Sequence, residues 1–209
     1  MKVANRVHLI DGTKGSYAYL VLGNEPVLVD TSFPGRTNRI VQSVEALGMR
    51  MSDIAHIVLT HHDPDHIGNA HALASLSGAM VWASETEIPF IHGDHKEQGI
   101  RKLISRLVRV KHPIVNRTYD NGVKIGDLEV IPSPGHTNGH VCFVVDDVLL
   151  AGDLVTTRRG KLKPAPFFLT TDKEALKRSI RDIGSLKFDV VCPAHGEPVK
   201  RSSLWEAMY

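Results

Sequence analysis

The sequence Thr60-His61-His62-Asp63-Pro64-Asp65-His66 directly follows a mostly apolar run, Ile54 to Leu59. It places five side chains that can bind a metal ion in six consecutive positions: His61, His62, Asp63, Asp65 and His66. Three later segments each set one His or Asp beside Gly or Pro, where a strand is expected to give way to a loop: Ser133-Pro134-Gly135-His136-Thr137, Ala151-Gly152-Asp153 and Pro193-Ala194-His195-Gly196. We expect these four dispersed segments to converge on one site.

The size and charge of the chain narrow the class of protein. At 209 residues and 42% hydrophobic, the chain is long enough to bury about 70% of its unfolded surface. No linker or low-complexity tract divides it, so we expect residues 1–209 to form a single domain. The formal charge is +2, with basic and acidic residues interleaved. This pattern argues against a nucleic-acid or membrane surface and favours a small-molecule substrate.

The amino-terminal residues and the two cysteines indicate the cellular compartment that we expect for the protein. Met1 to Arg6 carries charge but no apolar segment follows, and no stretch approaches about 18 consecutive apolar residues. A soluble, cytoplasmic protein is expected. Cys142 and Cys192 both lie in apolar stretches that are typical of buried strands, so we expect two reduced thiols in the core.

The order of the expected elements predicts the fold class. Strands and helices occur in both halves of the chain, which favours two mixed sheets packed face to face with helices outside, an αββα sandwich of the α/β class. The patterns predict a hairpin over 16–22 and 26–30, helices over 36–47, 67–76 and 172–186, strands over 79–82 and 190–192, a helical region over 84–110 and a run of strands over 123–150.

The spacing of the ligand candidates indicates how one loop can serve two metal ions. In an extended segment His61, Asp63 and Asp65 face the same way, while His66 turns to another side. The mixture of imidazole and carboxylate suits Zn²⁺, Fe²⁺, Mn²⁺ or Co²⁺ and lacks the thiolates of a closed structural zinc site. Two cations about 3.5 to 4 Å apart, bridged by a carboxylate and a hydroxide, would supply a nucleophile at neutral pH. Asp153 is the natural bridging carboxylate.

With these motifs the chain resembles the metallo-β-lactamase superfamily, whose signature is His-x-His-x-Asp-His followed by single His, Asp and His ligands. The resemblance covers nearly the whole chain and implies the αββα sandwich, with two divalent ions at one edge of the sheets, Zn²⁺ foremost and Fe²⁺ or Mn²⁺ as alternatives. It implies a first ion at His61, Asp63 and His136, a second at Asp65, His66 and His195, and Asp153 between them. Asp30 and His140 resemble outer residues that orient the ligands.

Position 63 departs from the commonest pattern, which has a second His there. With Asp63, Asp65 and Asp153 ionised, three negative charges meet the four positive charges of two divalent ions, and one hydroxide makes the site neutral. We infer a weaker Lewis acid at the first ion and a preference shifted toward Fe²⁺ or Mn²⁺. The competing interpretation is that Asp63 binds poorly and only the second site fills.

Other polar groups have ordinary interpretations. His62 points away from the ligands by alternation, and His92, Asp94 and His95 are typical of a solvated loop. Residues 158–169 have two interpretations. One is a solvated basic turn anchored by core aromatics. The other is a pocket wall, in which an anionic substrate binds the cations Arg158, Arg159, Lys161 and Lys163 and packs its apolar part on Phe167 or Phe168. The segment 84–110 can cap the pocket or form a homodimer contact, and both remain open.

The leading functional hypothesis is a metallo-hydrolase acting on an ester, lactone, thioester or phosphoester. Its catalytic carboxylates are Asp153, which bridges the ions, and Asp65, which can orient the hydroxide or pass a proton to the leaving group. The alternative is a non-heme iron oxidoreductase resembling the sulfur dioxygenases of the same fold, which the carboxylate at position 63 favours. Oxygen uptake with a persulfide substrate separates the two hypotheses.

Overall fold

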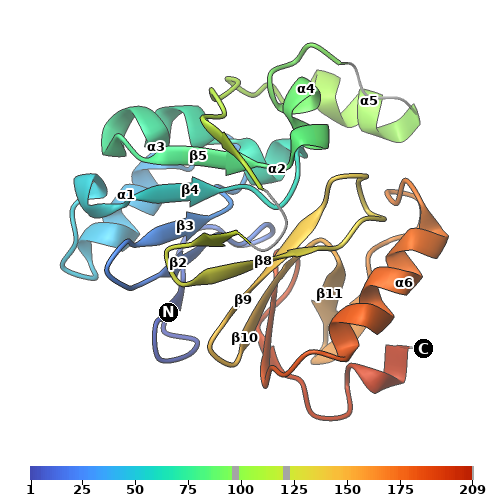
Figure 1. The fold of residues 1–209 in the computed structure, drawn as a ribbon. Helices are drawn as coiled ribbons and strands as arrows, with labels where there is room; N and C mark the ends of the chain where they lie inside the picture. The colour runs from blue at the N-terminus through green and yellow to red at the C-terminus, as the bar shows by residue number, and fades with distance from the viewer. Residues whose placement is uncertain (96–98, 120–122, 209) are drawn as a thin grey trace.

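The computed structural model describes residues 1–95, 99–119 and 123–208. Its first sheet runs in chain order through six strands, antiparallel as far as β3 and parallel from β3 onward (Figure 1). The strands are β1 Val7–Leu9, β2 Tyr19–Val21, β3 Val27–Val29, β4 His56–Val58, β5 Met80–Ala83 and β6 Arg117–Thr118. The hairpin predicted over 16–30 is therefore confirmed as β2 and β3.

The second sheet also has six strands, in the order β14-β13-β10-β9-β8-β7. All its pairs are antiparallel except β10 with β13, and a separate hairpin pairs β11 with β12. The strands are β7 Lys124–Ile125, β8 Leu128–Pro132, β9 Val141–Val145, β10 Val148–Gly152, β11 Val155–Arg158, β12 Lys161–Pro164, β13 Val190–Pro193 and β14 Val199–Lys200. Every residue of β10 is buried, as expected for a central strand covered on both faces.

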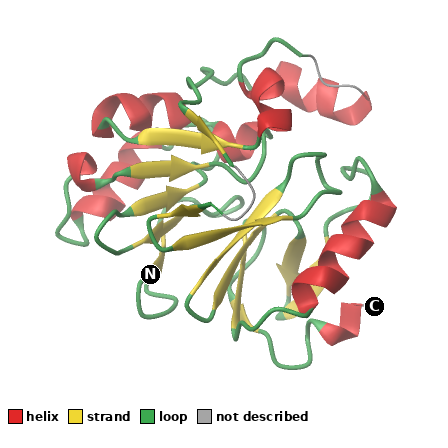
Figure 2. Cartoon of the chain, in the orientation of Figure 1, coloured by secondary structure: helices red, strands yellow, loops and turns green. Residues whose placement is uncertain are grey.

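Helices flank the sheets on their outer faces (Figure 2). They are α1 Thr37–Glu45, α2 Pro64–Ile67, α3 Ala70–Ser77, α4 Ile88–Ile91, α5 Gly99–Leu107 and α6 Lys173–Gly184, with short 3₁₀ turns η1 Met51–Asp53, η2 Glu85–Glu87 and η3 Glu206–Met208. The long helix α6 begins at Asp172, whose carboxylate accepts from the backbone N–H groups of Glu174 and Ala175 at 2.9 Å.

Three apolar clusters fill the spaces between these layers. The inner cluster joins the facing sides of both sheets and includes Val29 and Phe143. A second cluster lies between the first sheet and its helices, where Ile40 packs with Leu73, and a third joins the second sheet to α6. The layers thus run helix, sheet, sheet, helix, which confirms the predicted αββα fold.

Local structure differs from the predictions in several places. The helix predicted over 67–76 is two helices, because the side chain of Asn69 donates to the carbonyls of Thr31 at 2.6 Å and Phe33 at 2.7 Å and ties the break to a neighbouring loop. The polar hairpin of β11 and β12 was not predicted. Part of the region predicted over 84–110, residues 96–98, lies outside the described residues. Within the described ranges, no helix is long and apolar enough to cross a bilayer.

Candidate metal centre

The motif at 60–66 forms a loop followed by one helical turn. Asp63 is the residue before α2, and Pro64 occupies the first turn, where its missing N–H costs nothing. The prediction that 61–65 is extended is therefore wrong after Asp63. The turn still brings Asp65 and His66 to the same site, and the imidazoles of His61 and His66 are fully buried.

The second sheet contributes the other three candidate residues from the ends of its strands. His136 lies in the loop after β8, Asp153 directly after β10, and His195 shortly after β13. Because β10 and β13 are parallel, Asp153 and His195 emerge at the same edge. A hydrogen bond of 3.0 Å from the Val141 N–H to the Thr60 carbonyl joins this edge to the loop of the first sheet.

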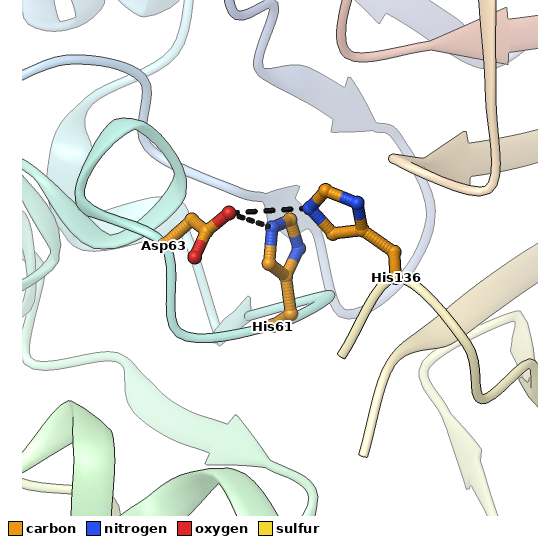
Figure 3. A group of neighbouring side chains, drawn as sticks. All are labelled: His61, Asp63 and His136. Carbon is orange, nitrogen blue, oxygen red and sulfur yellow. Dashed lines mark hydrogen bonds and ion pairs between the residues drawn. The ribbon is translucent and has the colours of Figure 1, made fainter. Parts of the chain in front are cut away.

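The first group of side chains is His61, Asp63 and His136 (Figure 3). Their side chains point toward one another from the two sheets. Oδ2 of Asp63 lies 3.3 Å from Nε2 of His61 and 3.2 Å from Nε2 of His136. Three donor atoms therefore surround one point.

A second group comprises Asp65, His66 and His195, and a third combines His61 and His66 with Asp153. Nε2 of His195 lies 3.2 Å from Oδ2 of Asp65. Oδ1 of Asp153 lies 3.3 Å from Nε2 of His66, while its Oδ2 lies 3.3 Å from Nε2 of His195 and 3.4 Å from Nε2 of His136. Asp153 thus touches members of both ligand groups.

These distances fit metal coordination. Ligand atoms bound tetrahedrally to one ion at about 2.1 Å lie about 3.4 Å from each other. Nε2 of His61, Nε2 of His66 and Oδ1 of Asp153 are buried and make no hydrogen bond to any described residue. Burying such atoms without a partner is costly, and a cation would satisfy all three.

The electrostatics leave three of the ligand candidates, Asp153, Asp63 and His61, in the ionisation states that bind a metal ion. Burial alone would raise the pKa of Asp153, yet the neighbouring His195 and His66 hold it well below its usual value. For Asp63, burial is likewise outweighed by His61, His136 and Arg101, and the pKa is well below normal. Burial lowers the pKa of His61 far below its ordinary value, so its ring is neutral. Ionised carboxylates and a neutral imidazole are the forms that bind metal.

Asp30 orients His66, as predicted. Its Oδ2 accepts from Nδ1 of His66 at 2.8 Å, which leaves Nε2 aimed into the site. Oδ1 accepts from the Thr60 N–H at 2.8 Å, and the Thr60 hydroxyl donates to Oδ2 at 2.8 Å. Burial alone would lower the pKa of His66, but Asp30, Asp153 and Asp65 raise it well above its ordinary value.

His140 holds the backbone of Asp153. Its Nε2 accepts from the Asp153 N–H at 3.0 Å, and its Nδ1 lies 2.8 Å from the Ser133 hydroxyl. Gly152 precedes Asp153 with φ of 49°, and a Cβ there would lie 2.8 Å from Nε2 of His140. The tight turn therefore needs glycine to present Asp153 to the site.

Two residues of the site, Arg101 and Glu87, have no motif in the sequence that predicts them. Arg101 on α5 reaches the first group and contacts both Asp63 and His136. Buried Glu87 accepts from the N–H groups of His62 at 3.0 Å and Gly139 at 2.7 Å, which joins the two halves of the site. The unusual carboxylate at position 63 was the one sequence signal for a nearby cation; nothing in the local pattern marked Glu87.

The groups expected to lie outside the centre do so. His62 belongs to none of the three ligand groups. Its ring stacks on Phe90, with ring centroids 4.5 Å apart, contacts Glu87, and has its Nε2 3.8 Å from Oδ1 of Asp63. His92, Asp94 and His95 form no metal-binding group among the described residues. Of the two interpretations of residues 158–169, the one with core aromatics is wrong in that respect, because Phe167 and Phe168 are 46% and 69% exposed.

A pocket of about 420 Å³ lies beside the motif. Part of its wall is formed by His62 and Pro64, which flank Asp63 in the sequence. Apolar lining comes from Ile67, Phe90 and Val108, and basic lining from His95, Lys102 and Arg106. The segment 84–110 therefore supplies much of the wall.

Comparison with known proteins gives consistent matches. A family model described as the metallo-beta-lactamase superfamily matches residues 11–195. YobT of Bacillus subtilis, described as uncharacterized, is 30% identical over 197 residues, which cover 86% of this chain and 82% of that protein. YflN of the same organism, described as a probable metallo-hydrolase, is 26% identical, with 95% and 86% covered.

Among solved structures, a metallo-beta-lactamase of Cronobacter sakazakii carrying substitutions in its HARLDQ motif has a TM-score of 0.75 and 24% identity. The match covers 93% of this chain and 79% of that one. At this identity the likeness supports the fold.

Proposed function

We propose, on the premise that this chain belongs to the metallo-beta-lactamase superfamily of metallo-hydrolases, that it hydrolyses a small molecule at a binuclear metal site. The susceptible bond is an ester, lactone, thioester or phosphoester. The observation that carries the proposal is Asp153, whose two carboxylate oxygens face histidines of both ligand groups at 3.3 to 3.4 Å.

In this proposal His61, Asp63 and His136 hold the first ion, Asp65, His66 and His195 hold the second, and Asp153 bridges them. When bound, the pair of ions supplies a hydroxide nucleophile at neutral pH and stabilises negative charge on the substrate oxygen. Zn²⁺ is the leading candidate for both positions. Asp63 adds a hard oxygen donor, which makes Fe²⁺ or Mn²⁺ the alternatives.

Asp65 is the candidate for proton transfer. Its side chain is 17% exposed, whereas that of Asp153 is 6% exposed, so Asp65 lies nearer the entrance. Oδ2 of Asp65 also lies 3.2 Å from Nε2 of His195. A carboxylate in this position can orient the attacking water and pass its proton to the leaving group.

The pocket beside the motif supports a substrate class. Apolar Ile67, Phe90 and Val108 suit a hydrocarbon or aromatic group, and Lys102 and Arg106 suit an anionic group. The volume of about 420 Å³ is within the usual range for small-molecule sites. We therefore place amphipathic anions first among substrates to test. The exposed turn at Arg158 and Arg159 is an alternative source of positive charge.

Turnover of p-nitrophenyl ester, lactone and phosphodiester substrates tests the proposal. The ion-loaded protein should hydrolyse at least one class, and removal of the ions by a chelator should abolish the reaction. Asp65→Asn should lower kcat by about 100-fold or more, because it removes both the proton acceptor and a charged ligand of the second ion. Asp147→Asn, at an exposed turn, is the matched control. Full activity after chelation would contradict the proposal.

Asp63 also favours a second candidate function, non-heme iron oxidation of a sulfur compound, because an added carboxylate suits iron. Oxygen consumption with a persulfide substrate, without hydrolysis of any ester or lactone, would replace the first proposal with this one.

A further inference from the structure

The guanidinium of Arg101 lies against the first ligand group. One of its nitrogens pairs with Oδ1 of Asp63, and the other lies 3.0 Å from Nε2 of His136. The second nitrogen also donates to the carbonyls of His136 at 3.2 Å and Leu169 at 2.7 Å. The Arg101 side chain is only 11% exposed. Its charge therefore lies inside the site, beside the two groups that would bind the first ion.

A guanidinium only donates, so the contact with Arg101 requires the His136 tautomer whose proton is on Nδ1. In that tautomer Nε2 has one lone pair, which can accept from Arg101 or bind an ion but cannot do both. We propose that Arg101 sets the affinity of the first ligand group, because its guanidinium and a divalent cation are alternative partners of His136. This inference rests on the proposed function, since it takes the His and Asp groups to hold ions. It predicts that the second group, which Arg101 does not touch in the structure, fills first.

The charges favour the same order of loading. Arg101 places a fixed positive charge next to the position of the first cation, and like charges repel. The pairing also accounts for the departure at position 63, because an aspartate can hold a guanidinium that a histidine would repel when protonated. Asp63 can thus pair with two cations, the guanidinium of Arg101 and a divalent metal ion from solution.

The helix that carries Arg101 buries no side chain in the core. Among the described residues of α5 none is buried, and Leu103 and Leu107 are 59% and 75% exposed. In Figure 1 this helix lies at the periphery, beside α4. Within the described part of this helix, the hydrogen bonds to the site come from the Arg101 side chain. Withdrawal of the guanidinium from His136 therefore costs mainly the hydrogen bonds of Arg101.

Calorimetric titration of the metal-free protein with Zn²⁺ tests the inference without an activity assay. The wild type should show one tight ion and a second at least tenfold weaker. Arg101→Ala should tighten the weaker site at least tenfold and change the tight site less than threefold. Arg101→Gln, which keeps a donor for the Leu169 carbonyl but lacks the charge, should tighten it too and guards against a folding defect in the alanine variant. Arg109→Ala, which removes an exposed arginine just after α5, should match the wild type.

The outcomes separate this inference from the proposed function. Equal affinities for both ions in the wild type, or a weaker site that is unchanged or weakened in Arg101→Ala and Arg101→Gln, would overturn the role of Arg101 and leave the metal centre standing. Failure of every variant, and of the wild type, to bind Zn²⁺ would overturn the proposed function itself, and the inference with it.

Discussion

Asp30 adopts a left-handed backbone conformation, with φ of 55°, where it gathers three donors around one carboxylate. Asparagine tolerates this conformation almost as well as aspartate, so exchanging the two changes charge more than shape. The carboxylate acts on the metal centre only through His66 and Thr60. Its contribution can therefore be measured apart from that of the ligands.

Asp30→Asn should lower the affinity of the second ion by about 10- to 100-fold, because asparagine has one accepting oxygen for the three donors and lacks the charge that raises the basicity of His66. Titration with Zn²⁺ measures the effect. Asp146→Asn is the matched control, since Asp146 also has a positive φ, of 53°, but pairs with Arg6 at the surface. Equal affinities in Asp30→Asn and the wild type would show that His66 is oriented without Asp30.

His140 makes the stability of the metal-free protein depend on pH. Burial lowers its pKa from 6.5 to about 3, so the ring is neutral in the fold but gains a proton in the unfolded chain below about pH 6.5. The unfolded chain then binds more protons, and stability falls as pH falls from 6.5 toward 3. The slope from this one group is at most about 1.4 kcal/mol per pH unit.

Urea unfolding at several pH values, compared between the wild type and His140→Gln, measures this contribution. The wild type should lose more stability than the variant between pH 6.5 and 4. Parallel losses in the two proteins would assign the pH dependence to other groups.

At the scale of elements, apolar periodicity predicted the structure well where one face of an element is buried. The helices predicted over 36–47 and 172–186 are α1 and α6, because Ile40 with Val44 and Leu176 with Ile180 repeat at helical spacing on a covered face. The hairpin of β11 and β12 is mostly polar and gave no such signal. Its place is set by contacts distant in sequence, such as the bond of 2.9 Å from the Thr157 N–H to the His195 carbonyl.

The loop that carries His136 packs tightly on α6. Gly135 has φ of 145°, and a Cβ there would lie 2.4 Å from the backbone of Leu176. Gly135→Ala should therefore destabilise the protein by about 3 kcal/mol, through both the clash and the backbone strain. Gly160→Ala, at φ of 72° with open space around it, should cost about 1 kcal/mol and is the control. Thermal or urea unfolding checks both values, and equal losses would refute the clash.

At the scale of the whole molecule, the candidate site lies where the edges of two sheets meet. The ligand candidates could be chosen from the sequence because four of them are clustered at 61–66 after an apolar run, and the other three, His136, Asp153 and His195, each stand beside Gly. Arg101 and Glu87 could not, because their roles arise from packing between segments far apart in the chain. The sequence motifs therefore predict the metal-ligand candidates, whereas the residues that contact those ligands from other segments can be identified only from the fold.

The most direct test of the central claim is a crystal structure of the Zn²⁺-saturated protein, with anomalous data recorded on both sides of the zinc absorption edge. We predict two zinc peaks about 3.5 to 4 Å apart, one among His61, Asp63 and His136 and one next to His66 and His195, with Asp153 between them. A single peak at saturation, or peaks outside these groups, would contradict the binuclear site.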